Sequence, residues 1–182
     1  MITNERGGLL LCCPRILFID LDGTVWNCLD ISLLTPPFTR INENEIIDSS
    51  GVIVKLFPKV RDFLKWAKNA GLYVASLSWN IREIAVEALK AFNIYELFDN
   101  HYIEFHPHKG IVMKKAINEI KTIIRYEVKP CNIVYIDDRT IHLDEVKREV
   151  GNVVFIHMWK NFKDYDEVRR FLEKLIQEEC MY

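Results

Sequence analysis

Two aspartates, Asp20 and Asp22, follow directly on the apolar run Ile16–Ile19 near the start of the chain. Such a run is typical of a buried strand in a parallel sheet. Residues two apart on a strand point to the same face, so we expect both carboxylates at the strand's carboxyl end. Two like charges repel unless a cation lies between them, and carboxylate oxygens suit Mg²⁺. The alternative is a polar turn before Gly23, because Asp and Gly are common turn residues.

Further polar residues stand close to the ends of other predicted strands. They are Ser78 and Asn80, then Lys109, then Asp137 and Asp138. About 30 residues separate Ser78 from Lys109 and Lys109 from Asp137, which is close to one βα unit. Parallel strands therefore place these groups along one edge of the sheet. Each also has a local interpretation, as a helix cap or a solvated charge at a helix start.

The charges of these groups restrict the ligand. Four aspartates and one lysine leave a charge of −3, which repels an anionic substrate. A divalent cation reduces this charge, and at about 4 Å it interacts with a carboxylate by several kcal/mol. A hydroxyl, an amide and an ammonium beside a metal match the oxygens of a phosphoryl group. One carboxylate can attack phosphorus to give an aspartyl-phosphate, and a second carboxyl can transfer protons.

The elements that must position these groups alternate between strand and helix. Apolar runs predict strands over 16–19, 72–77, 101–105, 132–136 and 153–156. Helical periodicity predicts helices that start near 58, 80, 111 and 143, and a last one at the C-terminus. This pattern predicts an α/β fold, a Rossmann-like three-layer α/β/α arrangement around a parallel sheet of five strands.

Residues 25–57 interrupt the alternation. The pair Pro36-Pro37 excludes regular helix there. Extended segments over 41–47 and 52–57 flank a four-residue turn, which predicts a β-hairpin. We therefore expect a small β-hairpin flap inserted over 25–57 in a single domain spanning 15–182, with an N-terminal extension over 1–14.

Composition adds broader expectations. A net charge of −2 gives no general attraction to nucleic acid or to an anionic membrane, and no apolar segment approaches the roughly 18 residues that span a bilayer. The five cysteines show no CxxC or zinc spacing. Unpaired, buried cysteines of this kind fit a reducing cytoplasm, so we predict a cytoplasmic protein without nucleic-acid or membrane partners.

Taken in chain order, four segments resemble the four motifs of the haloacid dehalogenase superfamily. They are Asp20–Thr24, Ser78 at a strand end, Lys109 at a helix start and Asp137-Asp138. Within that superfamily the chain resembles the magnesium-dependent phosphatase-1 family. The similarity there lies in Trp26, Pro36-Pro37-Phe38, residues 56–60 and Leu97-Phe98.

The resemblance implies a strand order of 5-4-1-2-3 and a role for each acidic residue. Asp20 would be the nucleophile and Asp22 the general acid and base. Magnesium would be bound by the carboxylate of Asp20, the backbone carbonyl of Asp22 and the carboxylate of Asp138. Asp137 would be a second acidic neighbour of the metal.

The same resemblance implies a substrate-binding set. Ser78 and Lys109 would hold the phosphoryl oxygens, assisted near Asn80. From its residue type, and not from the resemblance, we expect Trp79 to pack within the fold and to form a pocket wall. His106 and His108 directly precede Lys109, so we expect them to line the entrance or to contact substrate.

We therefore predict a magnesium-dependent phosphatase that hydrolyses phosphomonoesters through an aspartyl-phosphate. A site without a large lid admits a sugar phosphate, an aryl phosphate or phosphotyrosine on a peptide. One alternative keeps the fold and makes the chain a phosphotransferase or a dehalogenase. Another is a non-catalytic phospho-acceptor or binding domain. The oligomeric state, monomer or dimer, stays open.

Overall fold

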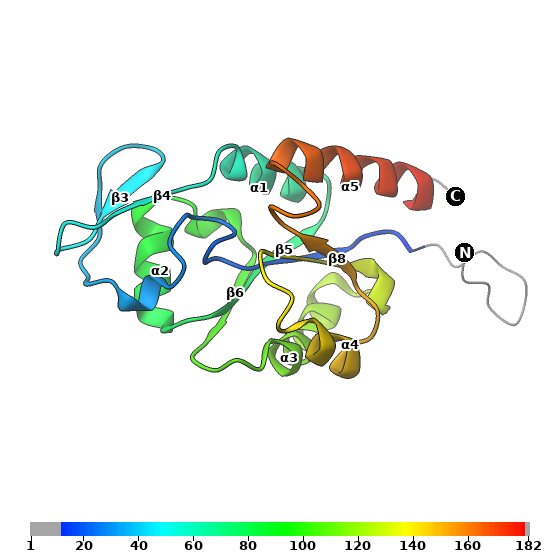
Figure 1. Ribbon diagram of the computed structural model, residues 1–182. Coiled ribbons are helices and arrows are strands. Elements are labelled where there is room, and N and C mark those ends of the chain that lie inside the picture. The colour runs from blue at the N-terminus through cyan, green and yellow to red at the C-terminus, as the bar shows by residue number, and fades with distance from the viewer. Residues whose placement is uncertain (1–11, 181–182) are drawn as a thin grey trace, which may run out of the picture.

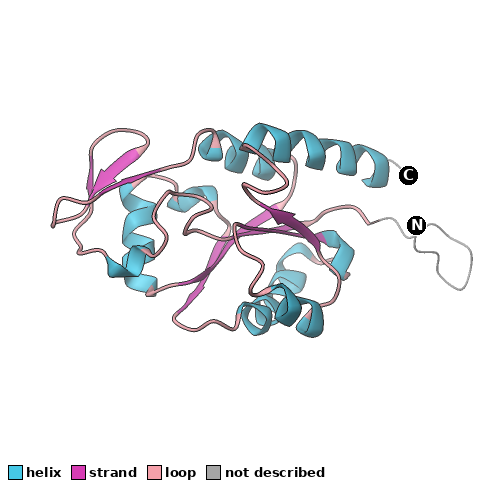
Figure 2. Ribbon diagram, viewed as in Figure 1, coloured by secondary structure: helices cyan, strands magenta, loops and turns pink. Residues whose placement is uncertain are grey.

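A central sheet of five parallel strands organises the computed structural model, which describes residues 12–180 (Figures 1 and 2). Its strands are β1 (Ile16–Ile19), β5 (Tyr73–Trp79), β6 (Asn100–Glu104), β7 (Ile133–Asp137) and β8 (Val154–His157). They lie in the order β6-β5-β1-β7-β8, and each neighbouring pair is parallel. The first strand of the chain is therefore the central one.

The observed labels differ from the expected series 5-4-1-2-3 because three strands of a second, smaller sheet fall between β1 and β5 in the chain. Counting only the strands of the central sheet, the order is 3-2-1-4-5. This is the expected series read from the opposite edge. The parallel α/β fold is confirmed, and the numbering changes because the insert contributes its own strands.

Helices cover both faces of the sheet. In Figure 1, α1 (Val60–Asn69) and α5 (Tyr165–Cys180) lie on the opposite side from α3 (Lys109–Ile124) and α4 (Leu143–Glu149), and α2 (Arg82–Ala91) flanks β5 and β6. The side chains of β1 alternate between two buried clusters. Leu17 and Ile19 pack with residues of α1, α2 and α5, whereas Ile16 and Phe18 pack with residues of α3 and α4. No helix within residues 12–180 has the length and apolar character to cross a bilayer.

The insert after β1 forms a three-stranded antiparallel sheet. It consists of β2 (Thr39–Arg40), β3 (Glu45–Ile47) and β4 (Ile53–Lys55), preceded by the short helix η1 (Ile31–Leu33). The expected hairpin is β3–β4, and β2 adds a strand that the sequence did not indicate. Ile31, Ile46 and Val54 are buried in the same cluster as β1, so the insert packs onto the main body.

Two element boundaries differ from expectation near the polar residues. Strand β5 extends through Ser78 and Trp79 because both pair with β6, whereas the apolar run had suggested an end at residue 77. Helix α3 begins at Lys109 itself. Two further short helices, η2 (Tyr95–Leu97) and η3 (Pro130–Asn132), precede β6 and β7.

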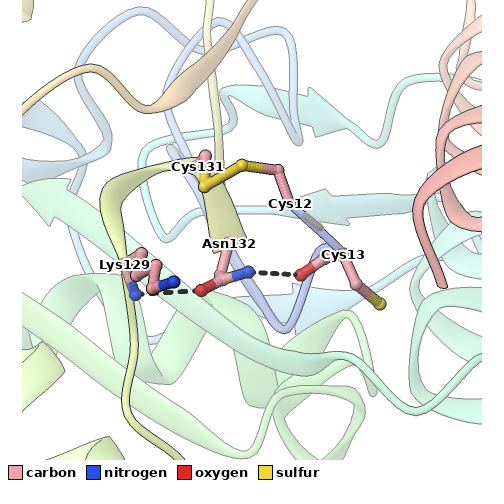
Figure 3. Close-up of a disulfide and its surroundings, with 5 residues drawn as sticks. All are labelled: Cys12, Cys13, Lys129, Cys131 and Asn132. Atoms are coloured by element: carbon pink, nitrogen blue, oxygen red, sulfur yellow. Dashed lines mark hydrogen bonds between the residues drawn. A yellow bond between two sulfur atoms is a disulfide. The ribbon is translucent and has the colours of Figure 1, made fainter. Parts of the chain in front are cut away.

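Four of the five cysteines form disulfides, which corrects the prediction that they are unpaired. Cys12 is bonded to Cys131 and Cys13 to Cys180, while Cys28 is free. Figure 3 shows the first bond beside Asn132. The partners are 119 and 167 residues apart, and no local spacing signals such pairs. The argument from unpaired cysteines to a reducing compartment therefore no longer holds.

The start of the described chain is also held by hydrogen bonds. The side-chain amide of Asn132 donates to the backbone oxygen of Cys13 at 2.8 Å, and its oxygen accepts from the backbone of Lys129 at 2.9 Å (Figure 3). Residues 12–14 of the expected extension are thus attached to the body of the domain. Residues 1–11 lie outside the described chain.

Candidate active site

Lys109 joins two of the predicted aspartates at the carboxyl edge of the sheet. Its Nζ lies 2.7 Å from Oδ1 of Asp20 and 2.7 Å from Oδ2 of Asp137. All three side chains are almost fully buried. Asp20 and Asp137 are 89 and 28 residues from Lys109 in the sequence, yet all three side chains meet at one point. The alternation of strands and helices predicts this meeting.

The register of the sheet explains this meeting. Ile19 of β1 is paired with Ile136 of β7, so Asp20 and Asp137 are the next residues on two neighbouring strands. The backbone N–H of Asp20 donates to the carbonyl of Ile136 at 2.9 Å. The two carboxylates are thus fixed by backbone pairing.

Asp138 completes a cluster of three acidic residues, Asp20, Asp137 and Asp138. One carboxylate oxygen of each lies within 4.8 Å of the others. Oδ2 of Asp20 is buried and accepts no hydrogen bond from the described residues. A buried oxygen without a donor is unfavourable unless a ligand satisfies it. The oxygens of these three aspartates form a donor set that suits Mg²⁺.

The protonation of the cluster follows from burial and from Lys109. Burial raises the pKa of Asp20 to about 7, although Lys109 opposes this shift. Burial alone would raise the pKa of Asp137 as well, but Lys109 and other donors lower it. Burial tends to lower the pKa of Lys109, and the two carboxylates raise it. Lys109 is therefore charged, and an additional cation beside Asp20 favours its ionised form.

Tyr135 contacts the acidic cluster and was not predicted from the sequence. Its hydroxyl donates a short hydrogen bond to Oδ2 of Asp137, and Nζ of Lys109 lies 5.9 Å from its ring centroid. Tyr135 and Asp137 share one face of β7. The sequence does contain a signal for this contact, because Tyr135 places a hydroxyl two residues before Asp137 within an otherwise apolar strand.

Asp22 lies outside the acidic cluster and has its own set of donors. Nε1 of Trp26 donates to Oδ1 of Asp22 at 2.6 Å, Nδ2 of Asn80 donates to Oδ2 at 2.9 Å, and the backbone of Ile31 donates as well. Burial raises the pKa of Asp22, and these donors partly oppose the rise. A carboxyl with a raised pKa retains a proton more readily, as a general acid requires.

Asn80 connects Asp22 to the end of β5 and to the insert. Its amide also donates to Oγ of Ser78 at 2.9 Å, and its oxygen accepts from Oγ of Ser32 at 2.6 Å. The same hydroxyl of Ser32 accepts from the backbone of Ile81 at 2.9 Å. Asn80 therefore does not cap α2, whose N-cap is Ile81. Ser32 was missed because nothing in its local sequence points to a contact 48 residues away.

Gly23 and Thr24 hold Asp138 in place. Oγ1 of Thr24 donates to Oδ1 of Asp138 at 3.3 Å and accepts from its backbone at 3.1 Å. Gly23 has a φ of +65°, and a Cβ added there would lie 2.6 Å from Oδ2 of Asp138. The loop after β1 therefore approaches Asp138 so closely that only glycine fits. Trp159 fixes this loop by donating to the carbonyl of Gly23 at 2.6 Å.

The two histidines beside Lys109 are paired with glutamates. Nε2 of His106 lies 2.5 Å from Glu104, and Nδ1 of His108 lies 3.0 Å from Glu145. Neither belongs to the acidic cluster formed by the described residues. Their contact with a substrate stays a prediction.

A pocket of about 280 Å³ opens next to Asp22. Its lining residues are Asp22, Leu29, Asp30, Trp79, Phe105 and Arg139. Trp79 lies at a wall of this pocket, with 39% of its surface exposed. Arg139 was not identified from the sequence, although it directly follows the acid pair.

Comparison with known proteins places this geometry in a family. The model of the family described as Acid Phosphatase matches residues 12–176. The human magnesium-dependent phosphatase 1 is 25% identical over 136 residues, which are 74% of this chain and 73% of that protein.

Solved structures share the fold. A hydrolase of the haloacid dehalogenase superfamily from Ehrlichia chaffeensis superposes with a TM-score of 0.59 at 13% identity, covering 90% of this chain and 98% of its own. The N-terminal part of a Bacteroides fragilis protein, which contains a phosphatase domain complexed with Mg, has a TM-score of 0.57 at 17% identity. That match covers 90% of this chain but only 40% of the Bacteroides chain. Because the family model spans nearly all described residues, the chain belongs to the acid phosphatase family, a family of phosphoric monoester hydrolases.

Proposed function

We propose that this chain is a magnesium-dependent phosphatase that hydrolyses phosphomonoesters through an aspartyl-phosphate formed on Asp20. The observation that carries the proposal is the environment of Asp20. One of its oxygens is held by Lys109, and the other is buried without a donor beside Asp137 and Asp138. A buried oxygen without a donor is unfavourable unless a ligand satisfies it, and a magnesium ion here would do so and would also bind a phosphoryl oxygen.

Magnesium fits these residues. The carboxylates of Asp20 and Asp138 and the backbone carbonyl of Asp22 are its proposed ligands, and Asp137 is the second acidic neighbour. When bound, the ion neutralises charge on the phosphoryl oxygens and on the carboxylates. Asp137 contributes mainly by fixing Lys109, because its oxygens already accept from Lys109, Tyr135 and the backbone of Arg139.

The first chemical step transfers the phosphoryl group to Asp20. A carboxylate oxygen of Asp20 attacks phosphorus, and the bond from phosphorus to the leaving oxygen breaks. Asp22 donates its proton to that oxygen, so the leaving group departs as an alcohol. Lys109 and Ser78 are proposed to hold the phosphoryl oxygens during the transfer.

The second step releases phosphate. Asp22, now a carboxylate, accepts a proton from water while the water oxygen attacks phosphorus. The bond between phosphorus and Asp20 breaks, and Asp20 returns as a carboxylate. The donors from Trp26, Asn80 and the backbone of Ile31 stabilise the ionised Asp22 between the two steps.

The proposed substrates are phosphorylated small molecules or phosphopeptides, namely a sugar phosphate, an aryl phosphate or protein phosphotyrosine. The human relative is named for magnesium-dependent phosphatase activity, which supports the reaction class. The pocket beside Asp22 exposes Leu29, Trp79 and Phe105, and these apolar walls favour the aryl phosphates. We further propose that residues 15–182 form one domain and that 25–57 are its insert.

The test is hydrolysis of p-nitrophenyl phosphate with and without Mg²⁺. Wild-type protein should turn over many equivalents with Mg²⁺ and none after EDTA, and Asp20→Asn should lose this activity. Asp62→Asn, an exposed aspartate on α1, serves as the control. Full activity of Asp20→Asn would refute the nucleophile assignment.

The same measurements separate the alternatives. A dehalogenase requires no metal and would act on a haloacid in the presence of EDTA. A phospho-acceptor domain would take up one phosphate per chain from a small phosphodonor and then stop. A phosphotransferase would give more phosphorylated alcohol than free phosphate when an acceptor alcohol is added.

A further inference from the structure

The pocket beside Asp22 is separate from the residues proposed to hold the phosphoryl group. Neither Ser78 nor Lys109 lines it, and both are almost fully buried. Asp22, the proposed acid for the leaving oxygen, does line it. If the phosphoryl group is transferred to Asp20, the leaving group therefore enters this pocket. Its walls then determine which phosphoesters are accepted.

Three walls of the pocket are apolar. Leu29, Phe105 and Trp79 are 75%, 70% and 39% exposed. Apolar side chains that surround a pocket gain free energy when an apolar ligand covers them. Trp79 has limited freedom because its ring contacts the buried ring of His142, with centroids 6.3 Å apart. This lining suits a flat, ring-shaped leaving group.

Arg139 is the one cation among the lining residues. Its backbone N–H donates to Oδ1 of Asp137 at 2.8 Å, which fixes its position directly after the acid pair. Its Nε is buried without a hydrogen-bond acceptor among residues 12–180, and the nearest carboxylate, Asp138, lies 3.9 Å away. A guanidinium with free donors is well suited to a planar oxyanion, which it binds with two parallel hydrogen bonds.

The two carboxylates of the pocket do not provide this partner. Oδ1 of Asp30 accepts from the backbone of Ser32 at 3.0 Å as the N-cap of η1. Asp22 accepts from Trp26 and Asn80. No ion pair joins either carboxylate to Arg139 within the described residues. Apart from the long 3.9 Å ion pair of its Nε with Asp138, the guanidinium has no carboxylate partner among residues 12–180, so its remaining N–H groups are available to a ligand.

We infer that Arg139 determines substrate specificity by binding an oxyanion on the leaving group, so that the preferred substrates are phosphomonoesters of a carboxylate-bearing aromatic alcohol. The inference rests on the proposed function and adds a substrate class to it. The phosphoryl group is held at Asp20, the ring is held by Leu29, Trp79 and Phe105, and the carboxylate pairs with Arg139.

The experiment compares three substrates that differ in one substituent. They are phenyl phosphate, 4-carboxyphenyl phosphate and 4-(aminomethyl)phenyl phosphate, each assayed with excess Mg²⁺ for kcat and KM. Wild-type enzyme should prefer the carboxylate over the amine in kcat/KM. In Arg139→Gln this preference should fall about tenfold, mainly through KM, because a charge-assisted pair is lost. Comparing the same substrates across enzymes cancels differences in leaving-group acidity.

Two variants keep the result interpretable. Arg148→Gln removes an exposed arginine of α4 and should retain the wild-type preference. Arg139→Lys keeps the charge without the planar fork and should retain part of the preference. Thermal unfolding verifies that each variant is folded. If Arg139→Gln were unfolded, the preference of Arg139→Lys relative to wild type would carry the test, and an undiminished preference there would overturn the inference.

Each outcome has one meaning. An equal loss on all three substrates would place Arg139 on the phosphoryl group and overturn the inference, and so would an unchanged preference. Hydrolysis by wild type without any preference would also overturn it while leaving the phosphatase proposal intact. If wild type hydrolysed a sugar phosphate with Mg²⁺ but none of the three aryl phosphates, the inference would be overturned and the phosphatase proposal would stand.

Discussion

Nε1 of Trp26 donates a 2.6 Å hydrogen bond to Oδ1 of Asp22, four residues earlier in the chain. The indole is fully buried and stacks on Phe92, with ring centroids 5.9 Å apart. The donor is therefore held rigidly against the carboxyl that we propose as the general acid. It lowers the pKa of Asp22 and opposes the rise caused by burial.

Replacing Trp26 with Phe should change the pH dependence of the reaction. The variant keeps an aromatic ring but loses the donor that lowers the pKa of Asp22, so this pKa should rise further. The first step needs protonated Asp22, so the alkaline limb of the kcat profile should move to higher pH. The matched control is Trp66→Phe on α1, for which an unchanged profile is expected. A profile of Trp26→Phe identical to wild type would remove Asp22 from the acid role.

Replacing Lys109 with Met should destabilise the fold as well as abolish activity. Asp20 and Asp137 would then be two buried carboxylates without a cation, which costs about 3–5 kcal/mol of unfolding free energy. Urea unfolding measures this loss. Lys114→Met, in the same helix but 58% exposed, should change stability by less than about 1 kcal/mol. A stable Lys109→Met protein would show that the buried ion pairs contribute little.

Replacing Gly23 with Ala should weaken metal binding. The new Cβ would lie 2.6 Å from Oδ2 of Asp138, so the carboxylate must move away from its position. Mutation of a residue that positions a metal ligand typically lowers affinity about 10- to 100-fold. The rise in thermal unfolding temperature with added Mg²⁺ reports the affinity. Gly71→Ala is the control, because Gly71 also has a positive φ but no atom within 4 Å of the added Cβ. Equal Mg²⁺ affinity in both variants would argue against Asp138 as a ligand.

The buried His101 should make stability depend on pH. Burial lowers the pKa of His101 to about 4, and its ring is neutral between Ser76 and the backbone of Tyr95. The unfolded chain binds this proton near pH 6.5, so the unfolded state gains protons first as pH falls. Stability should therefore decrease from about pH 6.5 down to about 4, by up to about 1.4 kcal/mol per pH unit.

The measurement is the unfolding free energy at pH 7, 6 and 5 for wild type and His101→Gln. The difference between the two proteins should shrink as pH falls, because the variant has no imidazole to protonate. A difference that stays constant over this range would mean that His101 titrates alike in the folded and unfolded chain.

The site residues that could be predicted are those whose positions follow from the ends and starts of regular strands and helices. Asp20, Lys109 and Asp137 follow or start regular elements, and parallel strands bring such positions to one edge. Their convergence could therefore be predicted from spacing alone. The strand order came from the resemblance to a family, because apolar runs do not specify which strands are neighbours.

The unpredicted part depends on contacts between distant loops. Ser32 reaches Asn80 from the insert, and Arg139 lines a pocket with residues of several other loops. Tyr135 lies in an apolar run and is therefore predicted as an ordinary buried strand residue, whereas in the structure its hydroxyl donates to Asp137. The extension of β5 through Trp79 was missed because pairing with β6 overrides the polar character of Ser78.

The two disulfides keep the chain covalently connected after a protease has cleaved it once. Cys12 and Cys13 are adjacent, and their partners are Cys131 and Cys180. A protease that cleaves one peptide bond anywhere between Cys13 and Cys180 therefore produces two fragments that remain covalently joined. Such a nicked protein would migrate as a single species in denaturing electrophoresis and separate into two bands only after a reducing agent is added.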